Sequence, residues 1–119
     1  MSIRYEIDGE VLIIRQNGVT DPVLIAETLA AALADAKLLP KSHLLWDATD
    51  APAQASADKM KAFVRSFDEM PQLSGRIAML VATDLQWGVS RMFSVYAEGA
   101  GSTAAVFYEA DEAMRWLRE

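Results

Sequence analysis

The chain has 119 residues, of which 52% are hydrophobic and 24% charged, and its formal net charge is −6. This length and apolar content suit one domain, residues 1–119, with a substantial core. The acidic balance and the scattering of the 11 lysines and arginines argue against nucleic-acid binding, which needs a positive patch. The apolar runs are too short for a membrane-spanning helix, and the chain has no cysteine and no recognisable leader, so we expect a cytoplasmic protein without disulfides.

Five strand-like segments alternate with four helix-like segments along the chain. Asp8-Gly9 is a dipeptide that readily adopts the positive φ angles of a two-residue turn, so the chain is expected to open with a hairpin. Asp21 is a candidate N-cap with Pro22 at the first helical position. The strands are expected at residues 3–7, 10–16, 42–48, 76–83 and 103–108, and the helices from 22 to near 40 and at 56–70, 84–98 and 110–118.

This order of elements implies an α/β fold with a five-stranded, mainly parallel sheet, in which only the first strand is antiparallel. The apolar runs at residues 11–14 and 77–82 do not alternate, as is typical of strands that are buried on both faces. If the strands lie in chain order, right-handed crossovers place every helix on one side and leave the other face partly bare. We therefore predict that a second subunit covers that face, in a homodimer.

Few residues favour catalysis or metal binding. The only histidine, His43, begins a strand and has no cysteine partner, so an ordinary polar role is favoured over a metal ligand. The serines lack a Gly-x-Ser-x-Gly elbow and a second base. Asp47 ends a buried strand at the carboxyl edge, where parallel sheets place their sites, but a hydrogen bond that pins the following loop is favoured over a functional role. We expect no enzyme activity, no catalytic residue, no metal and no cofactor.

Soft apolar side chains mark the helices expected at residues 56–70 and 84–98. Methionine and phenylalanine at helical spacing indicate core packing, but they also suit a cavity that opens when two helices part. Gly88, which costs about 1 kcal/mol relative to alanine inside a helix, indicates close approach of a neighbour or a ligand. Trp87 and Arg91 share one side of their helix, where they would bind an acidic ligand or form a surface cation–π pair.

Five segments distributed over the chain share their order and spacing with a known family. They are Gly9-Glu10-Val11-Leu12-Ile13-Ile14, Leu44-Leu45-Trp46-Asp47, Gly75-Arg76-Ile77-Ala78, Asp84-Leu85-Gln86-Trp87-Gly88 with Arg91-Met92-Phe93, and Asp111-Glu112-Ala113 with Trp116-Leu117. With them the chain resembles the SpoIIAA-like family, relatives of the STAS domain and, in fold, of the CRAL-TRIO lipid carriers. The resemblance implies a five-stranded βα superhelix without established enzyme activity that binds lipophilic ligands or a membrane surface.

One motif of the STAS relatives is missing from this chain. In STAS anti-sigma-factor antagonists, a serine in an Asp-Ser-Ser-Gly-like segment after the third strand is phosphorylated. The corresponding residues here, 47–56, lack that motif, and Ser56 is more simply read as a helix N-cap. The resemblance therefore does not extend to a phosphoswitch.

Two functions from different classes follow. The leading hypothesis is a non-catalytic module that holds a small lipophilic or amphipathic ligand between the helices at 56–70 and 84–98, with transient membrane contact through Lys59, Lys61 and Arg65. The alternative is a STAS-type regulatory domain that docks a partner protein through residues 49–55 and the helix at 56–70; an enzyme ranks third. The expected ligand contacts are Trp46, Phe63, Phe67, Trp87, Met92 and Phe93, with Asp47, Gln86 and Arg91 as polar anchors.

Overall fold

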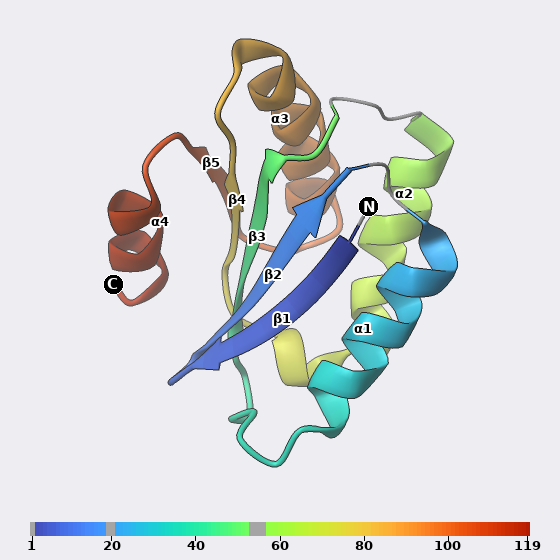
Figure 1. Ribbon diagram of the computed structural model, residues 1–119, viewed down its shortest axis with the longest axis vertical. Coiled ribbons are helices and arrows are strands. Elements are labelled where there is room, and N and C mark those ends of the chain that lie inside the picture. Colours follow the sequence, from blue (N-terminus) through green and yellow to red (C-terminus); the bar gives the residue numbers. More distant parts are fainter. Residues whose placement is uncertain (1, 19–20, 53–56) are drawn as a thin grey trace.

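The computed structural model describes residues 2–18, 21–52 and 57–119, which form a five-stranded sheet with helices on both faces (Figure 1). The strands lie in chain order, as expected, and only the first pair is antiparallel. Gly9, with a φ of 57°, makes the tight turn that forces this reversal. The strands are β1 (Ser2–Asp8), β2 (Val11–Asn17), β3 (His43–Asp50), β4 (Ile77–Leu80) and β5 (Ala104–Phe107).

Three helices cover one face of the sheet and a fourth covers the other (Figure 1). The prediction that every helix lies on one side is therefore wrong for the last one. The handedness rule applies to a helix that connects two parallel strands, whereas the last helix follows the final strand of the sheet and connects nothing. The helices are α1 (Pro22–Ala34), α2 (Ala57–Ser66), α3 (Asp84–Gly99) and α4 (Ala110–Leu117), with two short 3-10 turns, η1 (Phe67–Glu69) and η2 (Pro71–Leu73).

Alternating residues of the central strands supply two separate hydrophobic clusters. On β2, Leu12 and Ile14 face the larger cluster beneath α1, α2 and α3, while Val11 and Ile13 face the smaller one beneath α4. All four side chains are buried, which confirms the prediction of a two-sided strand. Because α4 covers the second face, the bare-face argument for a second subunit no longer holds, and self-association needs another basis.

Three element ends differ from the sequence prediction because side chains intervene. Helix α1 ends at Ala34 rather than near residue 40, and the Asp35 carboxylate accepts hydrogen bonds from the Lys37 amide and the Tyr5 hydroxyl, both at 2.9 Å. Helix α2 changes to 3-10 turns after Ser66, ahead of Pro71, which disfavours helical backbone at the residue before it. The other bounds agree within one or two residues, and Ser56, the expected N-cap of α2, lies outside the described residues.

Strand β4 is also shorter than expected, ending at Leu80 instead of continuing to residue 83. The backbone amides of Ala82 and Thr83 donate to the Gln86 side chain, at 2.7 and 3.1 Å, instead of to a neighbouring strand. Thr83 then caps α3, with its hydroxyl accepting from the Gln86 amide at 3.1 Å in a reciprocal capping box. The capping signal therefore stops the strand and starts the helix.

Candidate functional site

Four of the predicted ligand contacts come together between β3, α2 and α3. Trp46, Phe63, Phe67 and Phe93 form an aromatic cluster in which ring centroids lie 5.2 Å apart for Trp46–Phe63 and Phe63–Phe67, and 5.7 and 6.3 Å apart for Phe63–Phe93 and Phe67–Phe93. The pairs are T-shaped or tilted, the geometries that aromatic rings prefer. The Trp46 indole N–H donates to the Gln16 side-chain oxygen at 3.0 Å. These rings are in mutual contact, so a guest molecule would have to displace them.

Gln86 lies at the carboxyl edge of the sheet, and its side-chain amide forms hydrogen bonds only within the chain. It is 8% exposed. Its amide group donates to the carbonyl oxygens of Thr49 and Ala51, at 3.0 and 2.8 Å, while its oxygen accepts from Ala82 and Thr83. These four bonds use both donors and both lone pairs of the amide. Gln86 thus fastens the first turn of α3 to the segment that follows Asp47.

Asp47 occupies the opposite face of the sheet from the aromatic cluster. Successive strand residues point to opposite faces, so Asp47 lies on the side of Leu45 and α4, while Trp46 points toward α2. One carboxylate oxygen accepts from both the amide and the hydroxyl of Thr49, at 3.0 and 2.7 Å, and the other lies 4.0 Å from the Arg15 guanidinium. This is the loop-pinning arrangement that the sequence offered as the competing interpretation of Asp47.

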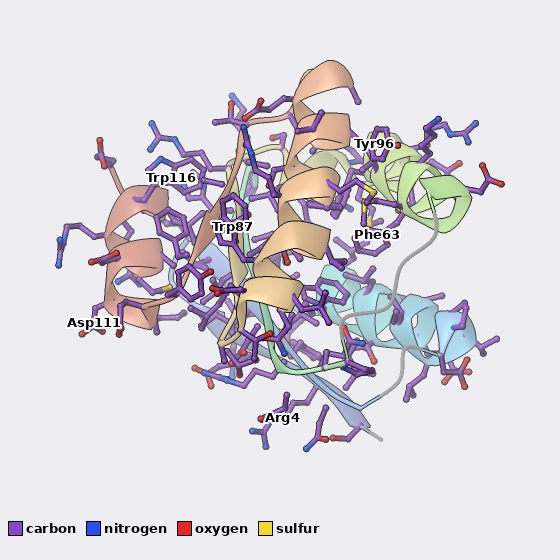
Figure 2. All side chains as sticks on the ribbon, turned by 90° about the horizontal axis from the view of Figure 1, so that it is seen from above. Arg4, Phe63, Trp87, Tyr96, Asp111 and Trp116 are labelled. Atoms are coloured by element: carbon purple, nitrogen blue, oxygen red, sulfur yellow. The ribbon has the colours of Figure 1, made fainter. Side chains whose placement is uncertain are left out.

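The remaining predicted contacts, Trp87, Arg91 and Met92, lie on exposed parts of α3. Figure 2 shows Trp87 on the side of α3 toward α4, whereas Phe63 and Tyr96 lie toward α2. The cation–π contacts of the described residues are Lys61 with Tyr96 and Arg76 with Trp116, so Trp87 and Arg91 do not form the expected surface pair. The nine residues predicted as one ligand site are therefore divided among a close-packed aromatic cluster, two structural polar groups and an exposed helix face.

Sequence reasoning singled out Trp87 as a ligand contact, but it did not assign Leu85 or Tyr108, two other exposed apolar side chains near the start of α3, to a site. Leu85 is 70% exposed, Trp87 39% and Tyr108 46%. The Tyr108 hydroxyl donates to the Asp84 carboxylate at 2.9 Å, which ties the end of β5 to the first turn of α3. Partial burial, the hydrogen bond and the nearby negative charge of Asp84 raise the pKa of Tyr108 above its usual value. On α3, Trp87 lies one turn from Asp84 and so on the same side as Tyr108, whereas Leu85, two residues from Trp87, points elsewhere. We call Trp87 and Tyr108 the carboxyl-edge patch.

A hollow of about 380 Å³ opens at the other, amino edge of the parallel strands. Two of its polar side chains, those of His43 and Arg76, are bonded within the chain. The His43 Nδ1 accepts from the Arg76 amide at 2.8 Å, and the Arg76 guanidinium donates to the Trp116 carbonyl at 2.7 Å. A Cβ at Gly75 would collide with the His43 ring, which explains the glycine there. His43 is thus a satisfied polar residue, as expected; the lining includes His43, Phe67, Met70, Leu73, Arg76 and Thr103.

No group of three or more His, Cys, Asp or Glu side chains is placed to hold a metal ion in residues 2–18, 21–52 and 57–119. In the same part of the chain, no helix combines the length and apolar character that crossing a bilayer requires.

Comparison with known proteins places the fold. The chain is similar to an uncharacterised protein of the DUF3478 family with a SpoIIAA-like fold from Shewanella loihica PV-4, with a TM-score of 0.65 and 20% sequence identity over 98% of this chain and 92% of that one. No family model and no curated protein matches the sequence. The chain therefore has a SpoIIAA-like fold, which confirms at the level of architecture the family that the sequence motifs suggested.

Proposed function

We propose that this chain is a non-catalytic regulatory module of STAS type that acts by binding a partner protein. The SpoIIAA-like fold supports this function class. The observation that carries the proposal is the carboxyl-edge patch, where two large aromatic side chains are exposed on a rigid support. Tyrosine and tryptophan are enriched at the centres of protein interfaces, because each offers a large contact area at a small entropy cost.

The support beneath the patch is rigid because two hydrogen-bonded links hold it. Gln86 ties the first turn of α3 to the carbonyls of Thr49 and Ala51. Tyr108 ties the end of β5 to Asp84. A partner that docks here would meet a surface that is ordered before binding, so little affinity is lost to ordering it. The region that we expected to dock a partner, residues 49–55 and α2, adjoins this support, although residues 53–56 lie outside the described residues.

The lipophilic-carrier hypothesis has weaker support. The side chains that would line its pocket are the rings of the aromatic cluster, which pack against one another at 5.2–6.3 Å between centroids. Admitting a ligand would require breaking these contacts, each of which contributes about 0.5–1.5 kcal/mol beyond area burial. Of the two hypotheses, partner docking uses surface that is already exposed.

Affinity capture with the immobilised chain tests the proposal. We expect a specific partner that is retained by the wild type and lost on the double substitution Trp87→Ala/Tyr108→Ala, because both aromatic contacts are removed. Leu39→Ala is the matched control, since Leu39 is also exposed (49%) but precedes β3 at the opposite edge. Retention that is equal in all three proteins would contradict the proposal. Native mass spectrometry that reveals a co-purified lipid, lost on Phe63→Ala, would instead favour the carrier.

A further inference from the structure

The outward face of α3 carries a line of apolar and glycine residues along its whole length. Met92 is 39% exposed and Val95 52%. Their spacing with the other members alternates three and four residues, the period of the a and d positions in a coiled-coil seam. Solvated helix faces usually carry polar side chains at such positions. We call this line the α3 seam; its members are Leu85, Gly88, Met92, Val95 and Gly99.

The two glycines of the seam face open space within the described structure. A Cβ at Gly88 or at Gly99 would meet no atom within 4 Å, so neither glycine is needed for packing inside this chain. Gly88 nevertheless costs about 1 kcal/mol relative to alanine in a helix. A glycine on an exposed helix face allows another backbone to approach closely. The close neighbour that Gly88 indicates is thus missing from the isolated chain.

Two opposite charges flank the seam on one side. Arg91 and Glu98 are seven residues apart on α3, so about 10.5 Å of helix separates them and they cannot pair with each other. Neither forms an ion pair with any residue that the structure describes. In an antiparallel pair of α3 helices, Arg91 of each copy comes opposite Glu98 of the other, which gives two reciprocal ion pairs. A parallel pair would place Arg91 level with Arg91 instead.

We propose that a second copy of this chain binds the α3 seam in an antiparallel, two-fold arrangement. Met92 of each copy then packs against Val95 of the other, and Gly88 of each copy lies opposite Gly99 of the other. The large side chains therefore meet at the centre of the helix pair, and the glycines lie on either side of them. The same patch on both subunits is self-complementary, as a closed dimer requires. One helix pair buries less area than standard stable interfaces, so we expect a weak dimer that forms at tens of micromolar. This interface is separate from Trp87 and Tyr108, and its test does not depend on partner capture.

Sedimentation equilibrium of the full chain tests the seam. We expect a concentration-dependent dimer in the wild type and a monomer in Val95→Asp, because the substitution buries an unpaired charge at the centre of the contact. Val23→Asp is the matched control and should dimerise like the wild type, since Val23 is also an exposed valine (65%) but lies on α1. A wild type that stays monomeric at hundreds of micromolar, or a dimer that persists in Val95→Asp, overturns the proposal.

Charge reversal tests the antiparallel orientation. Arg91→Glu or Glu98→Arg alone should raise the dimer Kd about fivefold, because each turns two attractive pairs into repulsive ones. The double variant Arg91→Glu/Glu98→Arg should restore wild-type affinity, which neither a parallel pair nor a misfolded chain would do. A double variant as weak as the single variants overturns the antiparallel seam.

Discussion

Helices α3 and α4 lie on opposite faces of the same sheet and differ in what they present to solvent. Helix α4 buries Ala113 and Leu117 and exposes Asp111, Glu112 and Arg115. Helix α3 also buries one side, but the opposite side carries the exposed apolar residues of the seam. Water satisfies the outward face of α4, whereas the outward face of α3 remains apolar. The difference teaches that α4 completes the fold, while α3 both completes the fold and offers a surface for another protein.

Their inward faces differ as well. Phe93 of α3 joins the aromatic cluster, whose other rings come from β3, α2 and η1. Helix α4 instead packs small and aliphatic residues on a smaller cluster, with Trp116 against Phe107 at 5.4 Å between ring centroids. A loss of side-chain volume should therefore be felt more strongly under α3 than under α4.

Truncation of the two inward faces is expected to have the largest effect. Phe93→Ala should lower the free energy of unfolding by about 3–5 kcal/mol and Leu117→Ala by about 2–3 kcal/mol, because α4 is short and follows the last strand, so its site can relax. Val95→Ala, on the outward face of α3, should change it by less than about 0.5 kcal/mol at concentrations where the chain is monomeric. Chemical denaturation provides the measurement. If Leu117→Ala costs as much as Phe93→Ala, the ranking of the two faces is wrong.

A smaller effect is expected when the side chain of Gln86 is removed, because it holds the first turn of α3 and has no counterpart at α4. Gln86→Ala leaves the amides of Ala82 and Thr83 and the carbonyl of Ala51 without their partner, so stability should fall by about 2 kcal/mol. The Glu109 N-cap of α4 has no such side-chain bond. Gln72→Ala, at an exposed glutamine of η2, is the control and should be nearly neutral. Equal midpoints for the two variants would show that Gln86 does not support α3.

The architecture was largely predictable because its signals are local. The Asp8-Gly9 turn, the Asp21 cap and the unbroken apolar runs each act within a few residues, and they placed the hairpin, α1 and the buried strands. The side of the sheet that α4 covers was not predictable from the handedness of crossovers, since no strand follows α4.

The candidate site was harder to predict than the fold. Periodicity indicated core packing for the phenylalanines and methionines of the two middle helices; this is right for Phe63, Phe67 and Phe93 but not for Met92, which is 39% exposed. Met92 is the residue before Phe93 and lies only about 100° from it around the helix axis, so the pattern alone cannot separate the edge of the core from a second apolar face. A count of three- and four-residue spacings that included Gly88 and Gly99 would have indicated the seam.

The smallest expected effect concerns the hydrogen bond between Tyr5 and Asp35, and it depends on pH. The Lys37 amide and then the Tyr5 hydroxyl hold the pKa of Asp35 below its usual value of 3.8. Because the folded pKa is the lower one, the stability that Asp35 contributes is present above pH 4 or so and is lost as the pH falls through the folded pKa. Tyr5→Phe should therefore differ from the wild type at neutral pH and converge with it in acid. Urea unfolding midpoints from neutral to acid pH measure this, and a constant offset would contradict it.

The four hydrogen bonds of Gln86 also have a mechanical consequence. They join Thr49 near the end of β3, and Ala51 just beyond it, to the turn before α3, two segments more than thirty residues apart in the chain. Any event that shifts the backbone at Thr49 or Ala51 must either rupture these bonds or carry the beginning of α3 with it. The Gln86 side chain thereby couples movement at the end of β3 to movement of α3, the helix that presents the outward surface.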